Sequence, residues 1–166
     1  MREIGAFRRA DMWRKDSTLL TEALETTRAA HPPRDIREYN PLQMAYIGDT
    51  LHDLFVRSAL LSGGMAVGGM HRQAVRMVSA GAQARMLEAI EPELTGPEAD
   101  AARRGRNAQA KHAAPKNADP ADYARATGLE ALWGYLYLTG QTQRLVDLQN
   151  MALSRTEDIW QKRSSR

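Results

Sequence analysis

The chain has 166 residues, 43% of them hydrophobic, which suits one domain with a sizeable core and excludes a wholly disordered protein. It has no cysteine, so disulfides and thiolate metal sites are excluded, and any metal ion must be held by Asp, Glu, His and water. The net charge of +3 leans only slightly toward polyanionic partners. The start lacks an apolar signal core, and the longest uncharged stretch, 58–70, is interrupted by glycines and too short to span a bilayer. A soluble cytoplasmic protein is therefore expected.

The apolar periodicity predicts an all-α fold, because no segment alternates as a strand would and no repeat occurs. Residues 1–38 are predicted to form an N-terminal extension with one helix, capped by Asp16 or Ser17. Residues 39–152 are predicted to form the main domain, and residues 153–166 a frayed basic tail.

The first helix of the main domain is predicted to begin at Asn40 as N-cap, with Pro41 in its first turn, and to end near Leu61. The pair Gly63-Gly64 then stops it. Its core stripe is expected to comprise Met44, Ile47, Leu51, Leu54 and Phe55.

On the other face of this helix, the spacing places Asp49, His52 and Asp53 together. Gly48 lies beside them inside the helix, where glycine costs about 1 kcal/mol relative to alanine. Close approach of another helix is the simplest compensation. Carboxylates beside so tight a contact could hold a divalent metal ion. His52 is expected at the surface or behind the metal ligands, and Asp53 either supports the ligands or is solvated.

A second acidic helix is predicted to begin at Asp119 or Asp122 and to end at Thr139-Gly140. Within residues 123–138, Glu130 is the lone acid in a run that is mostly apolar or small, with Thr127 on the same face. An acid in such a place is usually paired or metal-bound, since an unpaired buried charge is very costly. The spacing alone equally allows a half-exposed glutamate at the edge of a core helix.

Two further segments carry basic residues. A helix over about 70–90 is expected to bury Ala74, Val75, Val78, Ala82 and Met86. Its other face carries Arg72 and Arg76, which form either a solvated edge or a phosphate-contacting one. A last core helix over about 141–151 is expected to turn Leu145, Leu148 and Met151 inward.

After a turn and a short helix, residues 101–118 contain five Lys or Arg and no acid. Gly105 and Pro115 favour a flexible basic loop there over one continuous helix. Such a loop beside an acidic pocket suits a phosphodiester substrate, because the loop neutralises phosphates while the acids hold metal. The alternative is a solvated linker. Interleaved aromatic residues are absent, which argues against stacking on single-stranded bases.

Taken in order from about Pro41 to Leu148, these segments resemble the Mini-ribonuclease III family, bacterial ribonuclease III relatives without a double-stranded-RNA-binding domain. The motifs that carry the likeness are Tyr46-Ile47-Gly48-Asp49, His71-Arg72-Gln73-Ala74-Val75 with Val78-Ser79-Ala80, the basic segments 103–108 and 115–119, Ala126-Thr127-Gly128-Leu129-Glu130-Ala131-Leu132, and Gly134-Tyr135-Leu136-Tyr137-Leu138. Each motif alone is weak, but their order and spacing are specific.

The resemblance implies the helical ribonuclease III catalytic domain, working as a homodimer that cuts double-stranded RNA in maturation of precursor large-subunit (23S) ribosomal RNA. It implies Asp49 and Glu130 as catalytic residues and ligands of Mg²⁺, for which Mn²⁺ can substitute, with Asp53 and Thr127 supporting them. Trp133, Tyr135 or neighbours on the apolar helices are expected to contribute to the dimer interface. The RNA-binding residues implied are Arg72, Arg76, Arg103, Arg104, Arg106, Lys111 and Lys116.

The chain departs from the Mini-ribonuclease III pattern in one place, and it shares with that family a sparser set of acids than full-length ribonuclease III has. Gly81 stands where relatives usually carry a lysine, which removes one expected RNA contact. Leu42, Ala45 and Thr127 stand where full-length ribonuclease III carries further acids, so water would have to fill much of the metal shell.

Three rival functions follow from the same residues. The pair His52-Asp53 is compatible with an HD-type phosphohydrolase, but the other histidines show no convincing partner pattern. A non-catalytic RNA-binding or ribosome-assembly protein could share the fold, although retention of both Asp49 and Glu130 argues against it. A helical scaffold without a nucleic acid role would show no salt-sensitive RNA affinity.

Overall fold

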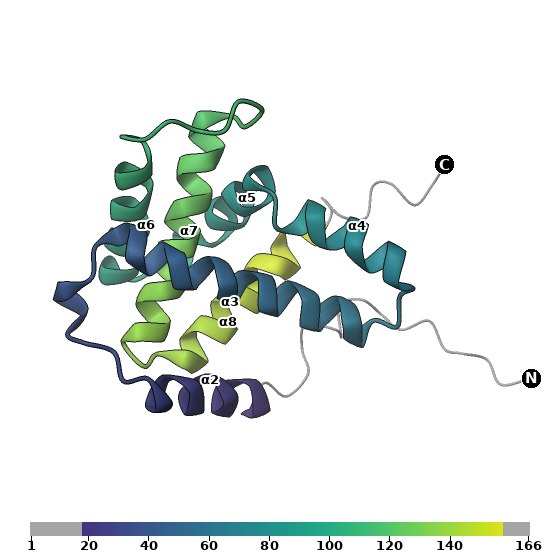
Figure 1. The fold of residues 1–166 in the computed structure, drawn as a ribbon, viewed down its shortest axis with the longest axis horizontal. Coiled ribbons are helices and arrows are strands. Elements are labelled where there is room, and N and C mark those ends of the chain that lie inside the picture. Colours follow the sequence, from purple (N-terminus) through teal and green to yellow (C-terminus); the bar gives the residue numbers. More distant parts are fainter. Residues whose placement is uncertain (1–17, 158–166) are drawn as a thin grey trace, which may run out of the picture.

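The computed structural model describes residues 18–157, and within them the secondary structure is entirely helical (Figure 1). The predicted all-α fold is therefore confirmed. In chain order, with the labels of Figure 1, the elements are α2 (Thr18–Ala30), η1 (Ile36–Glu38), α3 (Pro41–Ser62), α4 (Val67–Met77), α5 (Ala80–Ile90), η2 (Glu91–Glu93), α6 (Gly96–Gln109), α7 (Pro120–Leu138) and α8 (Thr142–Arg155). None of the described helices is long and apolar enough to cross a membrane.

Helix α7 is the centre of the fold. It crosses α3, runs beside α6 and packs against α5, while α8 and α2 lie at its C-terminal end (Figure 1). Leu129, Leu132, Trp133 and Leu136 of this helix have no exposed surface, and they join one continuous core with residues of the surrounding helices. Because α7 has neighbours on several sides, most of its length is apolar or small, and Glu130 is an exception that requires an explanation.

The crossing of α3 and α7 depends on two glycines. A Cβ atom on Gly48 would lie 1.7 Å from the carbonyl oxygen of Glu130, and one on Gly134 would lie 1.9 Å from the carbonyl oxygen of Met44. Neither distance is possible for a real side chain, so each helix has a glycine where the backbone of the other touches it. The close approach expected beside Asp49 is therefore present, and it is reciprocal.

Helix α6 approaches α7 in the same way, and this corrects the predicted flexible loop. A Cβ on Gly105 would lie 2.5 Å from the Cβ of Ala131, so Gly105 is a packing position within α6 and does not break the helix. Arg103, Arg104 and Arg106 are consequently helical. Only residues 110–119 form the connection between α6 and α7.

The predicted helix over 70–90 is also wrong as one element, because it is divided into α4 and α5. Ser79 caps the second helix by accepting a hydrogen bond from the Ala82 amide at 3.3 Å, and a serine in this role favours a helix start over a helix interior. The turn reorients α4, and Val75, expected in the core, is 54% exposed.

The helix ends lie where the capping residues of the sequence predicted them. Asn40 and Gln43 form a reciprocal capping box at the start of α3, and Gly64 adopts a φ of +68° just beyond its end. Asp119 caps α7. Helix α2 lies in the predicted N-terminal extension, whose expected caps Asp16 and Ser17 fall outside the described residues.

Two features of the core helices differ from the expectation. Leu54 of α3 was expected in the core and is 46% exposed. Helix α8 continues to Arg155, beyond its expected end near Met151, and Leu153 is buried within it.

Candidate active site

The crossing of α3 and α7 brings Asp49 and Glu130 together. Asp49 follows Gly48 directly and is exposed, whereas Glu130 lies half-buried opposite that glycine. The two carboxyl groups are close enough for the protonated Glu130 to donate a hydrogen bond to Asp49. Burial disfavours the charged form of Glu130, and the negative charge of Asp49 adds to this, so the pKa of Glu130 rises to about 8. The site therefore has a deficit of positive charge.

Gln83 of α5 is a third member of the site, and the sequence analysis missed it. Its side chain is almost fully buried, and its Nε2 donates a hydrogen bond to the Val78 carbonyl at 3.1 Å. The same amide donates to the Glu130 carboxylate, which opposes the rise in the pKa of that group. Its Oε1 is buried without a partner among the described residues. The available signal was a lone amide on the apolar side of helix 80–90.

Thr127 and Asp53, the two residues expected to support the metal ligands, have different surroundings. Thr127 is buried one turn before Glu130 on α7, and its hydroxyl donates to the Tyr123 carbonyl at 3.1 Å. Asp53 forms an ion pair with Arg57 at 2.8 Å, near the surface of α3. This ion pair therefore competes with the role expected for Asp53, which was to support the metal ligand Asp49.

His52 contradicts its expected place at the surface or behind the ligands. It has no exposed surface, its Nε2 lies 3.2 Å from the Met77 carbonyl, and its Nδ1 lies 3.1 Å from Nε2 of Gln149. A carbonyl only accepts, so the proton is on Nε2, and Nδ1 accepts from the amide. Burial lowers the pKa of this imidazole. His52 therefore links α3 to the end of α4 and to α8 as a neutral core residue.

The buried position of His52 removes the basis for an HD-type site. Within residues 18–157, no group of three or more His, Asp or Glu side chains is placed to hold a metal ion. The Asp49–Glu130 pair offers two carboxylates. Carboxylates are the donors that Mg²⁺ prefers, and Mg²⁺ commonly keeps several waters while binding one or two of them. The donor set thus fits a hydrated divalent cation, which would also relieve the repulsion between the two acids.

The basic residues expected to bind RNA divide among three places. Arg72 and Arg76 are exposed on α4, Arg103, Arg104 and Arg106 lie on α6, and Lys111 and Lys116 lie in the following connection. Arg103 forms an ion pair with Asp100, so its charge is partly neutralised.

Gly81 stands where relatives usually carry a lysine. A Cβ on Gly81 would have one neighbour within 4 Å, the Asp122 carboxylate at 3.6 Å, so the position is sterically open to a side chain.

The expected dimer-interface residue Trp133 is fully buried within the chain, so it cannot contact a partner. Tyr135 is half-buried and packs against the core. Within residues 18–157, the exposed large apolar side chains lie elsewhere, on α3, the turn after it and α4. They are Tyr46, Leu54, Leu61, Met65, Val67 and Val75.

The fold and the acid pair at its central crossing define a helical nuclease domain of the ribonuclease III type, and residues 42–141 match the ribonuclease III domain family. The chain belongs to this family. It is 53% identical to the Mini-ribonuclease 3 of Symbiobacterium thermophilum over 113 residues, which cover 68% of this chain and 86% of that protein. It is 39% identical to the Mini-ribonuclease 3 of Enterococcus faecalis over 132 residues, 78% of this chain and 99% of that protein.

A crystal structure of a protein from Fusobacterium nucleatum superposes with a TM-score of 0.65 at 25% identity, covering 72% of this chain and 96% of that one. The resemblance to Mini-ribonuclease III that the motifs suggested is therefore confirmed. As a family member the chain is an endoribonuclease of the ribonuclease III type.

Proposed function

We propose that this chain cleaves double-stranded RNA with the help of divalent metal ions, using Asp49 and Glu130 as catalytic residues. The observation that carries the proposal is the acid pair itself. Two carboxyl groups are held together at a crossing of helices whose backbones touch at Gly48, and one of them is poorly ionised without a cation. Family membership supports the choice of RNA as the substrate.

Mg²⁺ would be held by Asp49 and Glu130, with Mn²⁺ able to replace it. Such an ion, when bound, lowers the pKa of its water and stabilises charge on the phosphate under attack. The residues of the chain orient this chemistry. Gly48 fixes the separation of α3 and α7, and Gln83 holds the Glu130 carboxylate through its amide. Glu130 must be ionised to serve as a ligand, which a bound cation favours.

The proposed active form is a homodimer, since one small domain covers little of a duplex and two sites are needed to cut two strands. The exposed apolar side chains of α3 and α4 are the best candidates for its interface. Leu61 and Val67 are 70% and 78% exposed, and single-domain proteins rarely leave neighbouring large apolar residues open without a partner. Tyr135 is retained as a lesser candidate.

RNA contacts are proposed for Arg72 and Arg76 on α4, for Arg103, Arg104 and Arg106 on α6, and for Lys111 and Lys116. These cations would contact phosphates, which position a duplex without reading its sequence. Replacing Arg104 and Arg106 by alanine should weaken binding about equally for unrelated duplexes. A salt titration should show the slope of log affinity against log salt flattened by up to roughly two units. An unchanged slope would assign RNA binding to Arg72 and Arg76 instead.

The proposed cellular task is maturation of precursor large-subunit (23S) ribosomal RNA in the cytoplasm. The alternative is a non-catalytic RNA-binding or ribosome-assembly protein on the same fold. A cleavage assay separates the two, with a fully paired RNA incubated with Mg²⁺, with Mn²⁺ and with a chelator. The proposal predicts cuts in both strands with either metal and none with the chelator. Tight binding with intact RNA under all three conditions would establish the alternative.

A further inference from the structure

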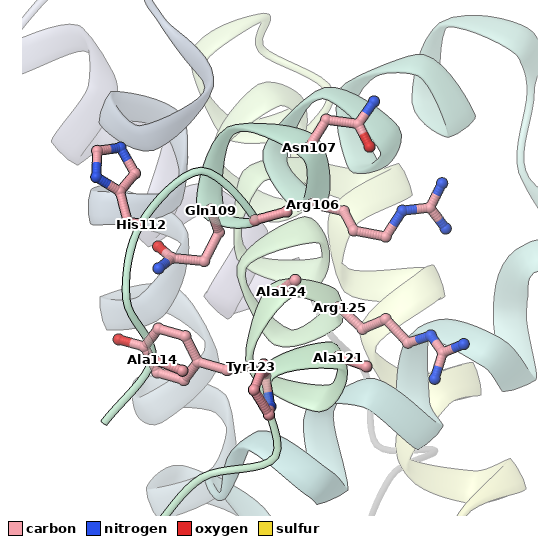
Figure 2. A pocket seen from close by; sticks show the side chains of 11 residues that line it. Arg106, Asn107, Gln109, His112, Ala114, Ala121, Tyr123, Ala124 and Arg125 are labelled. Atoms are coloured by element: carbon pink, nitrogen blue, oxygen red, sulfur yellow. The ribbon is translucent and has the colours of Figure 1, made fainter. Parts of the chain in front are cut away.

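A pocket of about 380 Å³ lies between the C-terminal half of α6, the connection that follows, and the first turns of α7 (Figure 2). None of the described residues that line it is acidic. Its charged and polar lining residues are Arg106, Asn107, Gln109, His112, Tyr123 and Arg125. Its volume is within the range of small-ligand pockets. Its two arginines favour an anionic group, and its tyrosine and amide side chains favour a flat ring that carries polar atoms.

The lining is divided by chemistry. Arg106 from α6 and Arg125 from α7 extend to the same side, whereas Gln109, His112 and Tyr123 lie toward the other (Figure 2). Arg106 makes no ion pair with any residue of the described chain, and Arg125 has only a long contact of 4.0 Å with Asp122. The guanidinium groups are therefore available to a phosphate, while a tyrosine ring and an amide on the other side suit a nucleobase.

The pocket is also close to the acid pair. Tyr123 and Glu130 are seven residues apart on α7, so they share one face at a separation of about 10 Å along the helix axis. A spacing of about 10 Å corresponds to only a few base pairs along a duplex. RNA whose backbone is held at Asp49 and Glu130 could therefore place a nearby nucleotide in the pocket.

We propose that this pocket binds one unpaired nucleotide of the RNA, with its phosphate between Arg106 and Arg125 and its base against Tyr123. The inference rests on the proposed function, because it specifies which RNA the site prefers. The basic segment 101–118 contains no aromatic residue, but folding brings Tyr123 beside it and supplies the stacking surface. The preferred substrate is then a duplex interrupted by a single unpaired nucleotide a few base pairs from the cut.

The test uses the full chain with Asp49→Asn, which should keep RNA intact during binding measurements. Affinity is measured for a fully paired duplex, for the same duplex with one unpaired nucleotide at successive positions, and for a free nucleoside monophosphate. One position should raise affinity at least about fivefold over the paired duplex, as expected for one stacked base. Tyr123→Ala and Arg125→Gln should each remove this gain, Tyr123→Phe should retain it, and thermal unfolding should show that the variants remain folded.

Arg104→Gln is the matched control, because Arg104 lies on α6 outside the pocket and should affect both RNAs alike. With Asp49 restored, moving the unpaired nucleotide by one base pair should move the cut by one. Equal affinity for paired and interrupted duplexes would overturn the proposal and leave the proposed function standing. Binding of the free nucleotide without a preference among RNAs, or a gain that survives Tyr123→Ala, would also overturn it. Failure to bind and cut any duplex would overturn both.

Discussion

Gly48 of α3 lies against the backbone of Glu130 on α7, so closely that a Cβ atom at position 48 would sit 1.7 Å from the Glu130 carbonyl oxygen. Gly48 directly precedes Asp49, and the residue that it touches is Glu130 itself. The separation of Asp49 and Glu130 is therefore set by backbone packing, which is stiffer than a contact between flexible side chains.

Substituting Gly48 by alanine should separate α3 from α7 and disrupt the acid pair. Because the added methyl group meets backbone atoms, we expect a loss of about 3 kcal/mol in unfolding free energy, at the upper end for overpacking, together with loss of cleavage. Urea unfolding and a cleavage assay measure the two effects. Gly96→Ala is the control, since a Cβ there would have no neighbour within 4 Å. Full activity of Gly48→Ala would show that the crossing does not set the site.

Replacing Gln83 by leucine should slow cleavage about 10- to 100-fold, the usual effect of losing a residue that orients a metal ligand. Leucine keeps the buried volume but cannot donate to Glu130 or to the Val78 carbonyl. The affinity for RNA should be unchanged, because Gln83 is buried away from the surface. Measuring rate against Mg²⁺ concentration should show a raised metal requirement. An unaltered metal dependence would restrict Gln83 to a structural role.

The acids Glu130 and Glu98 should shift the free energy of unfolding with pH in opposite directions. The pKa of Glu130 rises from 4.5 to about 8 on folding, so the native state binds the extra proton, and the metal-free protein should lose stability as pH rises between these values. Glu98 is hydrogen-bonded to Arg144, which lowers its pKa, so its contribution is present above pH 4.5 and is lost as pH falls. Unfolding by urea with a chelator, in Glu130→Gln and Glu98→Gln, should remove each dependence separately. A parent-like slope between pH 5 and 8 in Glu130→Gln would contradict the assignment.

A lysine at Val67 should weaken the proposed dimer by placing a charge in its apolar surface. Sedimentation equilibrium should find the parent dimeric at micromolar concentration and Val67→Lys largely monomeric, with cleavage reduced. Ala29→Lys, an exposed position on α2 outside this surface, is the matched control and should remain dimeric. A fully active monomeric parent would exclude dimerisation as a requirement.

Residues whose structural role is local were predictable from the sequence. Asn40, Asp119 and the pair Gly63-Gly64 mark helix ends through bonds to backbone groups a few residues away, and the structure has them there. The close helix approach beside Asp49 also followed from Gly48, because an interior glycine requires a reason.

Residues whose role depends on distant elements were missed or misplaced. Gly105 has the same packing function as Gly48, but in a basic segment it indicated a loop, since nothing nearby identifies Ala131 as its neighbour. His52 was assigned to the acidic face because its partners, Met77 and Gln149, are 25 and 97 residues away. Gln83 was overlooked for the same reason, as only the folded chain places its amide beside Glu130.

The account depends most on the claim that Asp49 and Glu130 hold the catalytic metal, and single-turnover cleavage at saturating RNA tests it most directly. Asp49→Asn and Glu130→Gln preserve side-chain shape and remove one charge each. Both should lower the rate in Mg²⁺ by at least about 100-fold, since mutation of essential catalytic groups commonly costs that much. Folding and duplex affinity should remain close to those of the parent. A parent-like rate in either variant, with binding intact, would show that the acid is not a metal ligand and would contradict the proposed site.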